Sequence, residues 1–130
     1  MEKKNCSIIY NPVTSGFKES KLDEVCKTLE QKYEVEKRKS EASGHAVELA
    51  QKSNLDSDLV ISYGGDGTFG ELIQGVYDEE QQALLSHIPI GTANDLRRNF
   101  GLQKNPVKSA ELIRDGVEQK LDIFTISSCL

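Results

Sequence analysis

The residues Asp58–Glu71, DLVISYGGDGTFGE, decide the fold of this chain of 130 residues. An apolar, β-branched run is followed by three glycines and an aspartate, and then by an amphipathic segment. This order is typical of a buried strand that turns directly into a helix. Two successive glycines, Gly64 and Gly65, remove the Cβ atoms where a ligand would approach the backbone closely. Amide groups at a helix start favour an anion, and a phosphate fits such a loop best.

Strand-like and helix-like segments alternate on both sides of this stretch. Strands are expected at residues 6–10, 33–39, 58–63, 87–90 and 118–126, and helices at residues 20–32, from residue 46, at 68–77, after Gly91 and at 106–115. Residues 33–39 alternate in polarity, which favours a sheet edge, whereas residues 58–63 are apolar and favour a central position. The alternation predicts an α/β fold, a three-layer α/β/α domain with a mainly parallel sheet.

The amino-acid composition argues against nucleic-acid binding, a disulfide framework and a zinc site. The formal net charge is −5, whereas nucleic-acid binding needs a concentrated basic surface, so nucleic acid is not an expected partner. The short basic run Lys37–Lys39 is interpreted as a solvated strand end. Three cysteines, Cys6, Cys26 and Cys129, are too few and too scattered for a disulfide framework or a zinc site. We therefore expect a reduced, cytoplasmic setting.

A parallel sheet places the carboxyl ends of its strands on one edge, where ligands bind. Four loops should share that edge, with the sequences NPVTSG (residues 11–16), SEASGH (40–45), GGDGT (64–68) and GTAND (91–95). Their small hydroxyl and amide groups would surround a common space. The glycine stretch therefore predicts one wall of a ligand site.

Part of the glycine stretch has a purely structural interpretation. Thr68 and Glu71 have the spacing of a capping box, in which each side chain satisfies a backbone amide of the other at a helix start. This leaves Gly64 and Gly65 unexplained. Asp66 would repel a phosphate unless a Mg²⁺ ion or a ribose hydroxyl lies between them, or unless the carboxylate holds neighbouring amides in place.

Two common phosphate loops match poorly. A Walker A loop needs Lys after its last glycine, but Thr68 follows Gly67 directly. A dinucleotide fingerprint is met by Gly65, Gly67 and Gly70. It also requires an acidic residue at the end of the next strand, where this chain has Gly91 and Thr92 instead.

The segments NPVTSG, SEASGHA, GGDGTFGE and IPIGTANDLRR, in this order and spacing, resemble the diacylglycerol kinase catalytic domain. Sphingosine and ceramide kinases are relatives of that family, and NAD kinases are more distant ones. The resemblance implies an NAD kinase/diacylglycerol kinase-like N-terminal domain at residues 1–130, with the family's second, β-rich domain absent from this chain. It also implies transfer of the γ-phosphoryl group of ATP, with Mg²⁺, to the hydroxyl of diacylglycerol or a related lipid.

The resemblance assigns roles by position. Asp66 and Asp95 match catalytic carboxylates, and Asp122 falls where a metal–water network has an acidic residue. The expected nucleotide-binding residues are Asn11, Pro12, Thr14, Ser15, Gly16, Ser40, Gly64, Gly65, Asp66, Gly67, Thr68, Gly70, Thr92 and Asn94. The chain departs from the family pattern at Gly70, which replaces Asn, at Arg97, which replaces a small residue, and at Ser40, which replaces Thr.

The resemblance also suggests how the protein meets its substrate. The partners are ATP and a lipid alcohol, and we expect peripheral membrane contact through the second domain; a homodimer is left open. The general base is expected beyond Leu130. Two alternatives remain: an NAD kinase-like phosphotransferase, and a non-catalytic nucleotide-binding regulatory domain, with which Gly70 is consistent.

Overall fold

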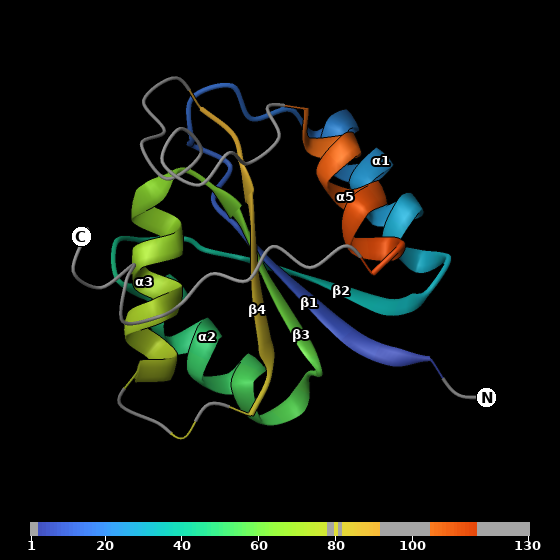
Figure 1. Ribbon diagram of the computed structural model, residues 1–130. Helices are drawn as coiled ribbons and strands as arrows, with labels where there is room; N and C mark the ends of the chain where they lie inside the picture. Colours follow the sequence, from blue (N-terminus) through green and yellow to red (C-terminus); the bar gives the residue numbers. More distant parts are fainter. Residues whose placement is uncertain (1–2, 78–79, 81, 92–104, 117–130) are drawn as a thin grey trace.

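Four parallel strands form one sheet in the order β2-β1-β3-β4 (Figure 1). The structure, a computed structural model, describes residues 3–77, 80, 82–91 and 105–116. Along the chain the elements are β1 (Lys4–Tyr10), α1 (Glu19–Glu30), β2 (Tyr33–Lys39), α2 (His45–Asp56), β3 (Leu59–Gly64), α3 (Asp66–Tyr77), β4 (Leu84–Pro89) and α5 (Pro106–Arg114). Every strand pair is parallel, which confirms the predicted α/β class.

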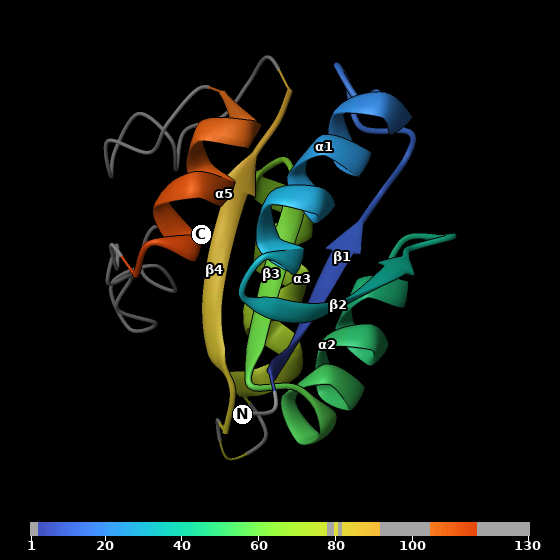
Figure 2. The ribbon, with the colours of Figure 1, turned by 90° about the vertical axis from the view of Figure 1, so that its right-hand side faces the viewer.

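Helices cover both faces of this sheet, with α1 and α5 on one side and α2 and α3 on the other (Figure 2). Successive strand residues point to opposite faces. On the first face, Ile8 and Ile61 pack with the buried residues of α1. On the second face, Ile9 and Val60 pack with α2 and α3. The molecule therefore has the predicted three layers, with one apolar core on each side of the sheet.

The strand positions follow the polarity of the sequence. β2 is an edge strand with the predicted bounds, and β3 is an inner strand whose residues are all buried. β4 begins at Leu84, three residues before the predicted start. Ser86 and His87 separate Leu84 and Leu85 from the later apolar residues of the strand, so the sequence pattern did not show its first half. The strand predicted at residues 118–126 and the helix predicted after Gly91 lie outside the described residues.

The buried face of α2 includes two polar residues. Ala46 and Ala50 are buried, Ser53 and Asn54 complete the buried face, and Val47 and Leu49 are half-buried. Asn54 is buried because its side chain forms hydrogen bonds with backbone groups of the segment that precedes β4. Its Oδ1 accepts hydrogen bonds from the amides of residues 82 and 83 (2.8 and 3.1 Å), and its Nδ2 donates to the carbonyl of residue 80 (2.9 Å). The burial of Asn54 therefore depends on partners that its polarity does not reveal.

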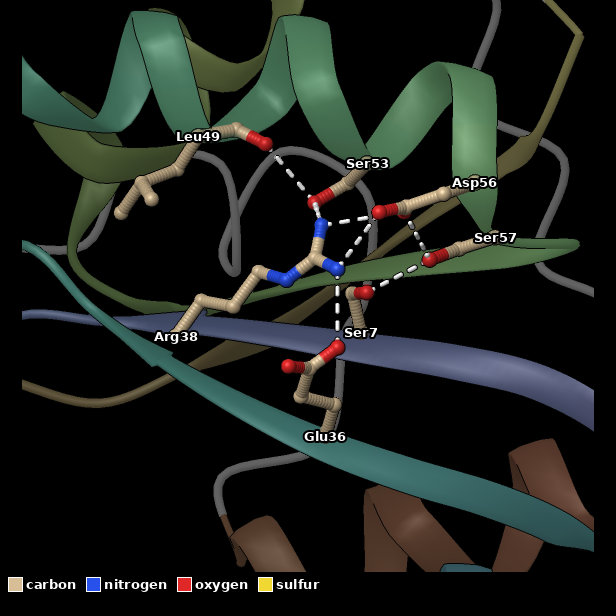
Figure 3. Close-up of polar contacts among 7 residues, drawn as sticks. All are labelled: Ser7, Glu36, Arg38, Leu49, Ser53, Asp56 and Ser57. Carbon is tan, nitrogen blue, oxygen red and sulfur yellow. Dashed lines mark hydrogen bonds and ion pairs between the residues drawn. The ribbon is translucent and has the colours of Figure 1, made fainter.

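Arg38 is another buried polar residue that the sequence did not reveal (Figure 3). Only 8 % of its side chain is exposed, although it lies within the basic run that was interpreted as solvated. Its guanidinium donates to both carboxylate oxygens of Asp56 (3.1 and 2.8 Å), to Ser53 Oγ (2.5 Å) and to Glu36 Oε2 (2.8 Å). The hydrogen bond from Arg38 lowers the pKa of the Asp56 carboxyl. Arg38 thus fastens the last turns of α2 to strand β2.

The network continues from α2 to the centre of the sheet. Ser57 Oγ donates to Asp56 Oδ1 (3.0 Å) and shares a hydrogen bond of 2.6 Å with Ser7 Oγ of β1. Ser53 Oγ donates to the Leu49 carbonyl (2.7 Å) within the helix. The C-terminal end of α2 is therefore tied to two neighbouring strands by side chains that satisfy one another.

Replacing Arg38 with methionine is expected to lower the free energy of unfolding by about 2 kcal/mol, because Ser53 and Asp56 would lose their donor while the buried stem is kept. The half-exposed Asp56 can turn to water, which keeps the loss below that of a fully buried pair. Chemical denaturation measures the effect. Lys39→Met, at the next and exposed position of the strand, is the matched control and should change stability by less than about 0.5 kcal/mol. Equal effects of the two substitutions would contradict the structural role of the network.

Within the described residues, no helix has the length and apolar character needed to cross a bilayer.

Candidate nucleotide site

The four strands end on a common edge of the sheet, and the loops that follow them touch one another. Ser40, after β2, donates its amide to the Tyr10 carbonyl at the end of β1 (2.8 Å). Ile90, after β4, donates its amide to the Gly64 carbonyl at the end of β3 (2.9 Å). The predicted convergence of loops is therefore present wherever the structure describes them.

The loop at residues 11–16 is built from two successive turns. Asn11 Oδ1 accepts from the Val13 amide (3.0 Å), and the Asn11 carbonyl accepts from the Thr14 amide (3.1 Å). The Thr14 carbonyl then accepts from the Phe17 amide (3.0 Å). The Asn11 side chain thus shapes this wall from within, a role that its residue type favours at turns.

Gly91 joins this loop to the end of β4. Its φ is +108°, and a Cβ there would lie 3.4 Å from the Ser15 carbonyl oxygen and 3.7 Å from Thr14 Cγ2. An L-residue side chain would be strained at this φ, and it would also crowd the neighbouring loop. The glycine therefore allows the first and last of the four loops to lie side by side.

Helix α3 begins at Asp66, two residues earlier than predicted. The Phe69 amide donates to the Gly65 carbonyl (3.3 Å), so Gly65 is the residue that precedes the helix and Thr68 lies inside its first turn. The predicted capping box of Thr68 and Glu71 is therefore wrong. Glu71 Oε1 instead accepts from the Gly44 amide (2.5 Å), at the start of α2.

The glycines of the loop have different reasons to be glycine. A Cβ on Gly64 would lie 2.8 Å from Thr68 Oγ1, because the buried Thr68 side chain packs against the end of β3. A Cβ on Gly65 would meet only the Ile90 carbonyl oxygen at 3.9 Å, and one on Gly67 would meet no described atom within 4 Å. Neither Gly65 nor Gly67 has a positive φ. The fold thus explains why residue 64 is a glycine. It gives no structural reason for the absence of side chains at Gly65 and Gly67, which leave bare backbone at the start of α3.

The bare backbone is suited to an anion. The first amides of a helix have no partner within the helix and carry the positive end of its dipole. Gly67 is exposed, and Gly65 and Asp66 are half-buried, so this end of α3 is open to a ligand. A phosphate can approach such amides closely only where side chains are absent. The donor set and the space at the loop therefore fit the phosphates of a nucleotide.

The structure brings most of the predicted site residues together. Twelve of them lie in these loops or in the first turns of α3: Asn11, Pro12, Thr14, Ser15, Gly16, Ser40, Gly64, Gly65, Asp66, Gly67, Thr68 and Gly70. Thr92, Asn94, Asp95 and Asp122, as well as Arg97, lie outside the described residues. No group of three or more His, Cys, Asp or Glu side chains forms a metal-binding cluster in the part of the chain that the structure describes.

Two residues near the site, Glu71 and His45, form contacts whose partners the sequence analysis did not name. Glu71 bonds to α2, and no local pattern could reveal a partner that lies 27 positions earlier. His45 Nδ1 accepts from the Glu41 amide (3.0 Å) and so closes the loop that precedes α2. A histidine at this spacing predicts such a contact only weakly, because many other side chains could accept the same hydrogen bond.

Residues 5–126 match the family described as the diacylglycerol kinase catalytic domain. The chain is 36% identical over 130 residues to a diacylglycerol kinase of Bacillus subtilis, with 95% of this chain and 42% of the relative covered. It is 35% identical over 125 residues to a diacylglycerol kinase of Staphylococcus epidermidis, with 93% and 39% covered. A crystal structure of a diacylglycerol kinase from Bacillus anthracis superimposes with a TM-score of 0.80 at 27% identity, over 89% of this chain and 43% of that one.

The chain thus spans about two fifths of the length of these relatives. Both the sequence matches and the structural match extend over nearly the whole of this chain. The likeness therefore includes the sheet, the helices and the loops of the carboxyl edge.

Proposed function

The chain belongs to the diacylglycerol kinase catalytic domain family, and on that premise we propose that it is the ATP-binding domain of a lipid kinase. The enzyme would transfer the γ-phosphoryl group of ATP to the hydroxyl of diacylglycerol or a related lipid. The observation that carries the proposal is the bare backbone of Gly65 and Gly67 at the start of α3, where the fold itself would accept a side chain.

The chain's own residues would act mainly by positioning. Phosphoryl transfer requires the phosphates to be held in line with the acceptor and their charge to be neutralised. The amides at the start of α3 would hold the phosphates, and the turns at residues 11–16 and the loop at residues 40–44 would form the walls around the nucleotide. We propose Thr92 and Asn94 as further nucleotide-binding residues.

We propose that carboxylates help to bind a magnesium ion at the site. Mg²⁺ usually binds through one or two carboxylates together with substrate phosphates, rather than in a cage made wholly of protein. Asp66, the first residue of α3, is placed for this role beside the glycine loop. Asp95 and Asp122 are the further carboxylates that we propose. When bound there, magnesium would supply charge neutralisation at the phosphates.

The lipid hydroxyl must lose its proton, and we propose that a general base for this step lies in the part of the relatives that the chain does not span. We also propose that this part makes the peripheral membrane contact of a cytoplasmic enzyme. A carboxylate of this chain would then act on the ATP side of the reaction.

The proposal is tested with the complete protein, Mg²⁺, ATP and either diacylglycerol or NAD. Phosphorylated lipid is the expected product. Product from NAD alone would replace the proposal with an NAD kinase-like phosphotransferase. Binding of ATP without either product would indicate a regulatory nucleotide-binding domain.

Gly67→Ala is expected to weaken Mg-ATP binding about tenfold, because a methyl group would separate the phosphates from the amides and weaken a charge-assisted hydrogen bond. The free energy of unfolding should stay constant or rise by up to about 1 kcal/mol, because alanine favours a helix and no described atom opposes its Cβ. Isothermal titration calorimetry and chemical denaturation measure the two effects. Gly65→Ala should behave similarly in binding. Unchanged affinity in both variants would place the phosphates elsewhere.

A further inference from the structure

Glu71 connects two walls of the site. It lies on α3, beyond the glycine loop, and its Oε1 accepts a hydrogen bond of 2.5 Å from the amide of Gly44. Gly44 is the residue that precedes α2, where its φ of +85° turns the chain into the helix. As a glycine, Gly44 has no side chain with which to cap α2. The carboxylate of Glu71 therefore supplies from another helix the cap that the start of α2 lacks.

The loop before α2 has few other attachments. Ser40 is anchored to Tyr10 by its amide. Beyond Ser40, the hydrogen bonds that the structure describes stay within the loop and the start of α2: Glu41 to His45 Nδ1, His45 to the Ala42 carbonyl, and Ser40 Oγ to the same carbonyl. Residues 41–44 are all exposed. Among the described contacts, the hydrogen bond from Gly44 to Glu71 is therefore what fixes this loop to α3.

The same contact distinguishes the two helix starts at this edge. The start of α2 carries positive dipole charge and already has a carboxylate within hydrogen-bond distance. A phosphate there would be repelled by Glu71. The start of α3 has bare backbone instead. Glu71 thus keeps α2 from competing for the ligand while it holds the loop of α2 beside the helix that receives it.

We propose that Glu71 is a positioning residue, which holds the loop at residues 40–44 against α3 so that the walls of the nucleotide site are in place before the nucleotide binds. The inference rests on the proposed nucleotide site. Loss of this hydrogen bond should free the loop, and ordering it again would oppose ligand binding. The effect should therefore appear in the dissociation constant and KM for ATP, with kcat unchanged.

Three substitutions of Glu71 distinguish the effect of side-chain length from the effect of its charge. Glu71→Ala removes the acceptor. Glu71→Asp keeps the charge but shortens the side chain, so the Gly44 amide should lose its partner. Glu71→Gln removes the charge but keeps an oxygen at the same reach. We expect about a tenfold rise in the dissociation constant for Mg-ATP in the Ala and Asp variants, and less than a threefold rise in the Gln variant.

The complete protein, labelled with ¹⁵N-glycine, gives a second readout that does not depend on the nucleotide. Exchange of the Gly44 amide with deuterated solvent should accelerate in the Ala and Asp variants and stay slow in the Gln variant. Glu48→Ala is the matched control, since it removes an exposed carboxylate from the first turn of α2. It should change neither readout.

Each contrary result has a distinct meaning. A protected Gly44 amide in the Ala and Asp variants would overturn the inference, because the hydrogen bond would not hold the loop. Fast exchange with unchanged ATP affinity would also overturn it, because the loop would not belong to the site. Equal effects of Glu48→Ala would show that helix charge, and not a positioned contact, is responsible. If the parent protein failed to bind Mg-ATP, the proposed function itself would fall, and this inference with it.

Discussion

Gly75→Ala is expected to lower the free energy of unfolding by about 3 kcal/mol, at the upper end of what an inserted methyl group costs in a packed core. A Cβ on Gly75 would lie 2.5 Å from the carbonyl oxygen of Val47 and 2.7 Å from Ala50 Cβ. Both neighbours belong to α2, and neither is the end of a flexible side chain. The methyl group can fit only if the two helices move apart.

Separation of α2 from α3 would disturb more than this crossing. Ala50 is also buried beside Ile9 and Val60 of the sheet, so α2 cannot shift outward without opening the core on this face. Interiors are packed closely enough that such a shift loses many small contacts at once. Alanine normally favours a helix over glycine, yet here this preference of about 1 kcal/mol is outweighed.

Gly67→Ala is the matched control for this substitution, because it adds the same methyl group to the same helix in open space. Chemical denaturation of both variants should show destabilisation only at position 75. If Gly75→Ala were as stable as the parent protein, the close approach of α2 and α3 would be wrong.

The close helix crossing illustrates what the sequence could not show. Periodicity predicted a helix at residues 68–77, and the structure has its helix α3 there, starting two residues earlier. Its apolar residues Phe69, Leu72, Ile73 and Val76 are buried. From the sequence alone, Gly75 indicates only a lower helix propensity at this position. Its meaning depends on Val47 and Ala50, which are far away along the chain and become neighbours only after the helices pack. The same limitation applies to Arg38, whose partner Asp56 lies 18 positions later.

The candidate site was more accessible to sequence reasoning than the helix packing. Parallel topology alone predicts that the ends of the strands share an edge, and the structure brings residues 11–16, 40–44 and 64–68 together there. The error concerned Glu71. Its spacing from Thr68 satisfies a local capping rule, but the helix starts earlier and the carboxylate reaches α2. Local rules cannot decide between a near partner and a partner on a neighbouring helix.

His87 should make the stability of the protein fall by about 3 kcal/mol between pH 6.5 and pH 4. The residue lies in β4, is 4 % exposed and stacks on Phe69 with ring centroids 4.6 Å apart. Its Nδ1 lies 3.3 Å from Ser62 Oγ, and its Nε2 has no hydrogen-bond partner among the described residues. Burial lowers the pKa of His87 from 6.5 to about 4, and a hydrogen bond with the Ser62 backbone offsets only part of this effect.

The direction follows from which state binds the proton. Below pH 6.5 the unfolded chain protonates His87, whereas the folded chain keeps the ring neutral until about pH 4. Stability is therefore full above pH 6.5 and falls as the pH approaches 4. Each pKa unit corresponds to about 1.4 kcal/mol, so the whole difference amounts to about 3.5 kcal/mol. About 3 kcal/mol of this is lost by pH 4, where only half of the folded chains carry the proton. Asp56 has a lowered pKa, so its contribution is lost only at more acidic pH.

Denaturation of the parent protein and of His87→Phe at several pH values between 7.5 and 4 isolates this contribution. Phenylalanine keeps a ring against Phe69 but cannot be protonated, and any loss from the unpaired Ser62 hydroxyl is independent of pH. The difference in stability between the two proteins should therefore change by about 3 kcal/mol in favour of the variant as the pH falls. A constant difference between parent and His87→Phe would mean that the ring is protonated in the folded state as readily as in the unfolded one, and hence that water reaches it between β4 and α3.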